Sequence, residues 1–254
     1  MAYNTEPQLT GRKILVTRPV GQADVLASLI EQQGGEAILL PVIDIVAVDS
    51  AQWQPWQPEL TDWLMFVSPN AVRCFMAGYQ RQLPEHIKLV AAGEGTAQAM
   101  RAHGLRVDLQ PELSNGSEGL LPLAQWQHMQ QQQVVIVRGN GGRELMANTL
   151  RDRGAQVNFL EVYRRELPTL PATVLQQALQ ADWLTITSVN GVKNLLSLLS
   201  DYRQQVVQKP LLVVSERIRD FASEQGFERV YVTADVSDTA MVQRLIEVGS
   251  DYAS

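Results

Sequence analysis

The chain has 254 residues, 45% of them hydrophobic and 19% charged, which suits a globular protein of one large domain or two smaller ones. Its formal net charge of −6 and the lack of any block of Lys or Arg argue against nucleic acid or an anionic membrane as its main partner. No apolar run is long enough to span a membrane, and the polar N-terminal segment predicts no secretory signal.

The cysteine and histidine content narrows the possible class of protein further. Cys74 is the single cysteine, so the chain has no internal disulfide framework, and we expect a cytoplasmic protein in a reducing compartment. The three histidines have no Cys or carboxylate at ligand spacing, so we expect no metal site.

Strand and helix patterns alternate along the chain. Short apolar runs predict buried strands at 13–17, 36–40, 63–67, 89–92, 107–109, 134–137, 156–163, 182–187, 211–214 and 229–232. Helical spacing follows most of these strands, and the glycines at positions 34, 104, 154 and 226 are expected to end helices. Ser68 is predicted to cap a helix that has Pro69 in its first turn. This alternation predicts an α/β fold with doubly wound parallel sheets.

The sequence repeats itself at a shift of 120 residues. Arg18 falls on Arg138, Asp62-Trp63-Leu64 falls on Asp182-Trp183-Leu184, and Ser68 and Asn70 fall on Ser188 and Asn190. The plainer alternative is that all βα units look alike. It does not account for Asp-Trp-Leu followed by Ser-x-Asn at one shift, so we infer an ancient duplication with about five βα units in each half.

The residues alone leave two divisions of this repeat open. A tandem arrangement would divide the chain near Gln130–Gln133, which looks like a linker. A permuted arrangement would divide it at two extended apolar segments that are equivalent in the repeat, and these segments favour it. It gives a discontinuous first domain of residues 1–40 and 168–254, a second domain of residues 49–162, and linkers at 41–48 and 163–167.

The polar residues that are suited to binding a ligand follow the predicted strands. Parallel strands end at one edge of a sheet, where the amide groups of helix N-termini attract anions. Together these residues indicate a site for a carboxylate- or phosphate-bearing ligand, although each Ser, Thr or Asn taken singly is more often a plain helix cap. The candidates are Thr17, Arg18, Ser68, Asn70, Thr96, Ser117, Arg138, Gly139, Ser188, Asn190 and Ser215.

Motifs for common cofactors and catalysts are broken or missing. In Gly139-Asn-Gly-Gly-Arg-Glu144, the glutamate stands where a dinucleotide fingerprint needs a glycine, and no Walker A or Gly-x-Ser-x-Gly pattern is present. We therefore expect no cofactor. Tyr163, at the end of an apolar strand beside Arg164 and Arg165, is the candidate acid. The alternative is an interface tyrosine whose hydroxyl is already satisfied.

An ordered set of motifs along nearly the whole chain resembles the uroporphyrinogen-III synthase family. The motifs are Ile14-Leu-Val-Thr-Arg-Pro19, Phe66-Val-Ser-Pro-Asn-Ala-Val72, Ala92-Gly-Glu-Gly-Thr-Ala97, Ser117-Glu-Gly119, Val137-Arg-Gly139 with Gly142-Arg-Glu144, Val162-Tyr-Arg164 and Ile186-Thr-Ser-Val-Asn-Gly-Val192. The chain departs from the family pattern at Ser215-Glu-Arg-Ile218, where many members carry Gly-x-x-Thr. Ser215 and Arg217 are the residues that would replace the family's threonine contact.

The resemblance implies two α/β domains joined by two extended linkers, in the permuted arrangement. It implies a cofactor-free lyase that takes linear hydroxymethylbilane, inverts its last pyrrole ring and closes the macrocycle with loss of water. The product, uroporphyrinogen III, is the precursor of haem, sirohaem and corrinoids. The resemblance also implies that the tyrosine at 163 assists departure of the hydroxyl, and that Thr96, Ser68 and Ser188 line the cleft. We expect a monomer that receives this polycarboxylate from hydroxymethylbilane synthase.

Two alternative functions are compatible with parts of the sequence. One is a non-catalytic, two-lobed binding protein for a small polyanion. The other is a nucleotide-binding oxidoreductase, which the broken glycine-rich motifs disfavour.

Overall fold

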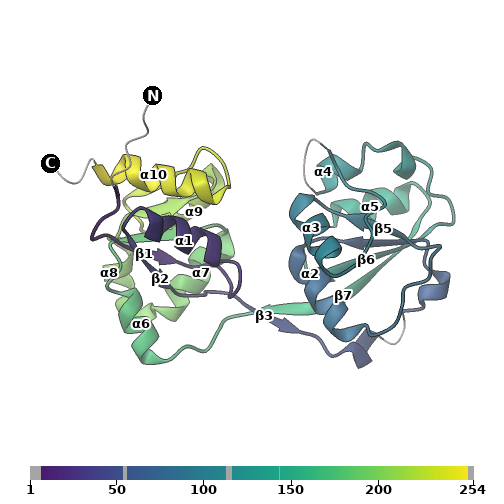
Figure 1. Cartoon of the computed structure of the whole chain (residues 1–254), viewed down its shortest axis with the longest axis horizontal. Coiled ribbons are helices and arrows are strands. Elements are labelled where there is room, and N and C mark those ends of the chain that lie inside the picture. The colour runs from purple at the N-terminus through teal and green to yellow at the C-terminus, as the bar shows by residue number, and fades with distance from the viewer. Residues whose placement is uncertain (1–6, 54–55, 113–115, 143, 251–254) are drawn as a thin grey trace. The chain divides into compact units, whose positions relative to one another are not determined.

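The chain folds into two compact units, each built on one five-stranded sheet (Figure 1). The computed structural model describes residues 7–53, 56–112, 116–142 and 144–250. Unit 1 comprises residues 1–44 and 166–254, and unit 2 comprises residues 45–165. The predicted α/β class with two parallel-dominated sheets is confirmed. Among the described residues, no helix is long and apolar enough to cross a membrane.

Unit 1 is a parallel sheet covered on both faces, with strand order β10-β9-β8-β1-β2. Alternate strand residues point to opposite faces, so α1 and α10 cover one face while α6 to α9 cover the other. The elements are β1 (Lys13–Val16), α1 (Asp24–Gln32), β2 (Glu36–Leu39), α6 (Ala172–Ala178), β8 (Trp183–Ile186), α7 (Val189–Leu198), η4 (Ser200–Tyr202), α8 (Arg203–Val207), β9 (Leu211–Val213), α9 (Glu216–Glu224), β10 (Val230–Val232) and α10 (Asp238–Ser250).

Unit 2 has the strand order β3-β7-β6-β4-β5, and its β4–β5, β4–β6 and β6–β7 pairs are parallel. Helices α2 and α3 pack on one face of this sheet, and α4 and α5 pack on the other. The elements are β3 (Asp44–Ala47), η1 (Ser50–Trp53), η2 (Pro58–Leu60), β4 (Trp63–Phe66), α2 (Pro69–Gly78), β5 (Lys88–Ala91), α3 (Glu94–Ala102), α4 (Ser117–Leu120), η3 (Ala124–Trp126), β6 (Gln133–Gly139), α5 (Leu145–Asp152) and β7 (Gln156–Glu166).

The chain passes between the units twice, between residues 44 and 45 and between residues 165 and 166. Neither passage is a structureless linker. Strand β3 occupies residues 44–47, and β7 runs on to Glu166, so both segments take part in the sheet of unit 2.

The internal repeat is visible in the strand order of the two sheets. Strands β9-β8-β1-β2 of unit 1 correspond to β5-β4-β6-β7 of unit 2, and they lie in the same sequence across the sheet. The counterpart of β10 is reduced to a single bridge between Val90 and Leu109, so the strand predicted at 107–109 is wrong in extent. The reason is local: the carboxylate of Asp108 accepts the amide of Leu89 at 2.7 Å, so a side chain makes one of the contacts at this edge of the sheet.

The repeated aspartates explain part of the duplicated motif. Asp62 accepts the backbone amide of Gln133 at 2.7 Å, and Asp182 accepts that of Lys13 at 2.8 Å. Each carboxylate therefore holds the first amide of the neighbouring strand, β6 in unit 2 and β1 in unit 1. Hydrogen bonds to a charged acceptor are stronger than neutral ones, so these two contacts fix the register at the amino ends of the strands.

We expect Asp182→Ala to lower the free energy of unfolding by about 1–2 kcal/mol, because the first amide of β1 loses a charged acceptor. Scanning calorimetry would measure the change in unit 1, and Asp62→Ala is the matched variant in unit 2. Asp201→Ala, at an exposed aspartate in the short η4 helix, is the control. An equal loss of stability in that control would contradict the assignment.

Candidate functional site

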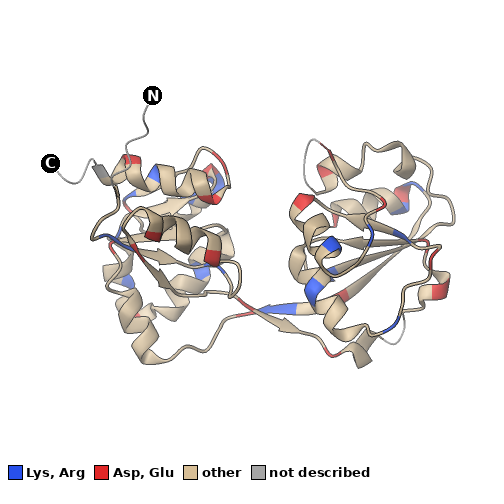
Figure 2. Cartoon of the chain, in the orientation of Figure 1, with Lys and Arg blue, Asp and Glu red and all other residues tan. Residues whose placement is uncertain are grey.

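The candidate residues of both units lie where strands end and helices begin. Each unit carries its own set. In unit 2 the set is Ser68, Asn70, Thr96, Ser117, Arg138, Gly139 and Tyr163, and in unit 1 it is Thr17, Arg18, Ser188, Asn190 and Ser215. Basic and acidic residues are interspersed along the elements of both units in Figure 2.

Tyr163 lies at a β-bulge between the ends of β6 and β7. Arg138 is paired with Glu161, but the next residue, Gly139, is paired with Tyr163, so Val162 is the extra residue. The ring of Tyr163 packs directly over Gly139. A Cβ atom at that glycine would lie 2.4 Å from Cε2 and 2.5 Å from Cζ of the ring. Tyr163 is consequently only 1% exposed.

The phenol oxygen of Tyr163 has two polar neighbours. Arg165 Nη2 donates to it at 2.9 Å, and Ser68 Oγ lies 3.3 Å away, where either hydroxyl is able to donate. Ser68 also caps α2 by accepting the amide of Ala71 at 3.1 Å, as predicted. The three side chains therefore form one connected group at the carboxyl ends of β4 and β7.

Arg165 was not among the predicted site residues. Its backbone amide donates to Asn140 Oδ1 at 3.1 Å, and the amide of Asn140 donates to the carbonyl of Tyr163 at 2.9 Å. The loop after β6 thus holds the end of β7 in place. Residues two apart on a strand share a face, so the position of Arg165 after Tyr163 was the available sequence signal.

Thr96 lines a cavity of about 420 Å³ at the start of α3. It is 4% exposed. The cavity also contains Ser117 in the first turn of α4, with Glu94 and Glu118 beside it. Hydrogen bonds from Gln98 and Gln110 hold the pKa of Glu94 below its ordinary value, so this carboxylate stays charged and opposes an anion.

Asn70 lies in the first turn of α2, and its side-chain oxygen accepts from the guanidinium of Arg73. The contact is made along one face of the helix, three residues apart.

Arg138 is held inside unit 2. Its guanidinium stacks on Phe159, with 3.6 Å between the guanidinium carbon and the ring centroid, and Nη2 pairs with Glu161 at 3.2 Å. The residue is 9% exposed, and its Nε and Nη1 atoms are buried with no hydrogen-bond partner among the described residues. The stacking offsets part of the cost of these unpaired donors.

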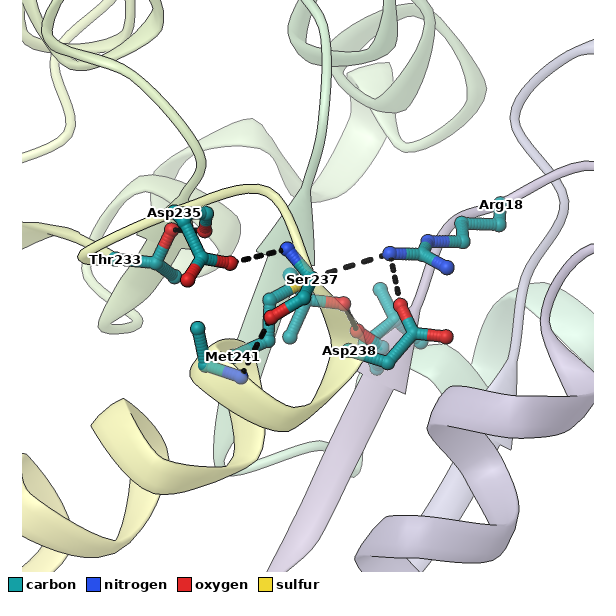
Figure 3. Close-up of polar contacts among 9 residues, drawn as sticks. Arg18, Thr233, Asp235, Ser237, Asp238 and Met241 are labelled. Carbon is teal, nitrogen blue, oxygen red and sulfur yellow. Dashed lines mark hydrogen bonds and ion pairs between the residues drawn. The ribbon is translucent and has the colours of Figure 1, made fainter. Parts of the chain in front are cut away.

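Arg18 makes a comparable contact in unit 1 (Figure 3). Its Nη2 pairs with Asp238 at 2.5 Å and lies 3.4 Å from the sulfur of Met241, so it ties the end of β1 to the start of α10. Just before it, the hydroxyl of Thr17 donates to the carbonyl of Thr185 at 2.6 Å. Both residues are engaged in contacts within their own unit.

The first turn of α10 is capped from the loop before it (Figure 3). Ser237 Oγ accepts the amide of Ala240 at 3.2 Å, and Asp235 Oδ1 accepts the amide of Ser237 at 2.7 Å. The hydrogen bonds from Ser237 lower the pKa of Asp235. This loop therefore orders the helix that holds Asp238 against Arg18.

Ser188 and Ser215 occupy equivalent N-cap positions but behave differently. Ser188 caps α7 by accepting the amide of Gly191 at 2.9 Å, and Asn190 is exposed in the same turn. Ser215 stands before α9 with an extended backbone, and its side chain makes no capping bond. Ile218, which is buried, occupies the position that Thr96 has in unit 2, so unit 1 lacks the threonine hydroxyl.

The described residues contain no group of three or more His, Cys, Asp or Glu side chains arranged to hold a metal ion. The motif residue Arg143 lies outside the described residues.

Comparison with known proteins gives a consistent result. The family model described as uroporphyrinogen-III synthase HemD matches residues 24–243. The uroporphyrinogen-III synthase of Escherichia coli is 31% identical, with 91% of this chain and 99% of that protein covered. The solved structure of uroporphyrinogen-III synthetase from Helicobacter pylori is 16% identical, covers 93% of this chain and 99% of its own, and superposes with a TM-score of 0.66.

A mutant uroporphyrinogen III synthase from Thermus thermophilus superposes with a TM-score of 0.59 at 19% identity, covering 95% of this chain and 100% of its own. At such low identity the two solved structures show a shared fold.

We expect Gly139→Ala to lower the free energy of unfolding by about 1–3 kcal/mol, because the new methyl group would overlap the ring of Tyr163. Denaturant unfolding would measure it. Gly95→Ala is the matched control, since a Cβ there meets nothing nearer than 4.0 Å and the residue lies in a helix. It should be neutral or stabilising by about 0.5–1 kcal/mol. Equal effects of the two variants would show that Gly139 is not needed for space.

Proposed function

We propose that this chain, which belongs to the uroporphyrinogen-III synthase family, converts hydroxymethylbilane to uroporphyrinogen III, inverting the terminal pyrrole ring and releasing water. The observation that carries the proposal is the family match over residues 24–243, which includes every candidate residue except Thr17 and Arg18. The alternative of a non-catalytic binding protein for a polyanion is not favoured, because identity to a named synthase extends over 91% of the chain.

The proposed reaction needs little acid–base catalysis. Departure of the substrate hydroxyl leaves a cation that the pyrrole nitrogen stabilises, so one proton delivered to the leaving oxygen is enough. The group around Tyr163 supports this role, since its phenol lies between a hydroxyl and a guanidinium at the carboxyl ends of the strands. On this basis we assign the chain to the cyclising lyases that need no cofactor.

Recognition of the substrate is a matter of local contacts. The substrate carries eight carboxylates, whereas the chain has a net charge of −6, so long-range attraction is absent. The amide groups that begin α2, α3, α7 and α9, with the hydroxyls of Thr96, Ser188 and Ser215, are suited to hold single carboxylates, and Ser68 is the substrate contact beside Tyr163. The candidates Asn70 and Asn190 lie in the first turns of α2 and α7, and Ser117 is the first residue of α4.

The proposal includes a cytoplasmic monomer that receives its substrate from hydroxymethylbilane synthase. Cys74 is unpaired, which fits a reducing compartment. Burial also raises the pKa of its thiol, which keeps the cysteine in the less reactive protonated form at neutral pH.

Incubation with freshly generated hydroxymethylbilane tests the function directly. We expect the III isomer of uroporphyrinogen, identified after oxidation by chromatographic separation from the I isomer that forms spontaneously. The control is the same mixture without the protein. Accumulation of isomer I alone would exclude the proposed activity.

We expect Tyr163→Phe to lower kcat by about a hundredfold, the low end for a general acid, and to change KM little. The ring still fills the space over Gly139, so the fold should persist. Initial rates of isomer III formation over a range of substrate concentrations separate the two parameters. An unchanged kcat would leave Tyr163 as a packing residue, and a rise confined to KM would make it a binding residue.

A further inference from the structure

We propose that Tyr163 acts on the substrate through Ser68, so that the serine hydroxyl is the catalytic group that meets the leaving oxygen and the tyrosine delivers the proton behind it. This inference rests on the proposed function and deepens it, because it separates the residue that touches the substrate from the residue that holds the proton.

The burial of the two residues supports this order. Tyr163 is 1% exposed, and it belongs to the apolar cluster that includes Leu160 and Val162. Its ring lies against Gly139 with no space for an added methyl group. Ser68 is only partly buried and stands at the start of α2, at the edge where the strands end. A ligand at that edge therefore meets the serine hydroxyl before it meets the phenol.

The hydrogen bonds give the direction of the proton. A guanidinium has only donors, so Arg165 occupies a lone pair of the phenol oxygen and leaves the phenol proton free for another acceptor. The nearest one is Ser68 Oγ at 3.3 Å. Ser68 already accepts the amide of Ala71, and its second lone pair accepts the phenol proton. The serine proton is then directed toward the edge of the sheet. The 3.3 Å separation is long for two hydroxyls and has to shorten when substrate binds.

The protons given up and taken back by the protein balance over one turnover. Tyr163 transfers its proton to Ser68 Oγ as Ser68 transfers its own to the leaving hydroxyl, so the C–O bond of the substrate breaks and water departs. The tyrosinate that results lies 2.9 Å from the guanidinium nitrogen of Arg165, which stabilises the negative charge. When the macrocycle has closed, the ring carbon loses a proton, and that proton returns along the same path. No other reactant is needed.

The duplication offers an internal comparison. Ser188 is the counterpart of Ser68 and caps α7 in the same way, with its hydroxyl accepting the amide of Gly191. At the shift of 120 residues, however, Tyr163 corresponds to Ile43 and Arg165 to Ile45. The N-cap serine is therefore shared by both units, whereas the phenol and the guanidinium behind it are present in unit 2 only. Capping alone does not require them.

A double-mutant cycle on the full-length chain tests the relay, with kcat for isomer III formation as the readout. We expect Ser68→Ala and Tyr163→Phe each to lower kcat by about a hundredfold, and the double variant to be within about threefold of the slower single variant, because both break one path. Ser68→Thr keeps the hydroxyl and the cap and should restore most of the rate. Tyr163→Phe combined with Ser188→Ala is the control, and there the two effects should multiply.

Thermal unfolding separates catalysis from capping. Ser68→Ala and Ser188→Ala each remove one helix cap, so both should lower the Tm by a similar amount, about 2–4 °C. If the wild type is active, two results would overturn the relay alone. One is that the losses in kcat from Ser68→Ala and Tyr163→Phe multiply, and the other is that Ser68→Ala leaves kcat unchanged. A wild type that forms only isomer I would overturn the proposed function and the relay with it.

Discussion

The parallel register of each sheet is the constraint on which the rest of the molecule depends. Parallel strands end at one edge, so the residues that follow them gather there with the amide groups of the next helices. Asp62 and Asp182 fix the register at the opposite ends, where each holds the first amide of a neighbouring strand. A slip in register would move Gly139 away from Tyr163, and the phenol would lose both the space for its ring and its partners.

Both units have such an edge at the carboxyl ends of their strands, but the residues at that edge differ between them. Unit 1 carries a hydrogen bond from Thr17 to Thr185 inside its sheet, where unit 2 has the apolar residues Val137 and Met65. Because these threonine hydroxyls are satisfied by backbone carbonyls, their burial leaves no unpaired polar group. Unit 2 instead has a glycine, a tyrosine and an arginine in contact. The duplication thus produced one edge held by backbone contacts and one that carries Tyr163, the candidate acid.

Periodicity and capping predicted most of the fold from the sequence, since both depend on neighbouring residues. The strands, the Ser68 and Ser188 caps and the repeat follow from local patterns. What local patterns do not contain is the partner of a side chain. The ion pair of Arg18 joins it to Asp238, which lies far along the chain, and the contact of Gly139 with Tyr163 depends on a bulge between two strands. The packing of Gly139 against Tyr163 and the hydrogen bond from Arg165 to the phenol are therefore visible only in the structure.

The pairing of the arginines changes how a polyanion would be held. Arg18 and Arg138 each face a carboxylate of their own unit, and drawing either away would leave that carboxylate without its partner. Helix amide groups and hydroxyls carry partial positive charge, so they hold a carboxylate without breaking an arginine ion pair, and Glu94 opposes such binding at the start of α3. Their attraction is short-ranged and directional. A site built from them responds to the orientation of each carboxylate more than to total charge, which is the discrimination that inversion of a single ring requires.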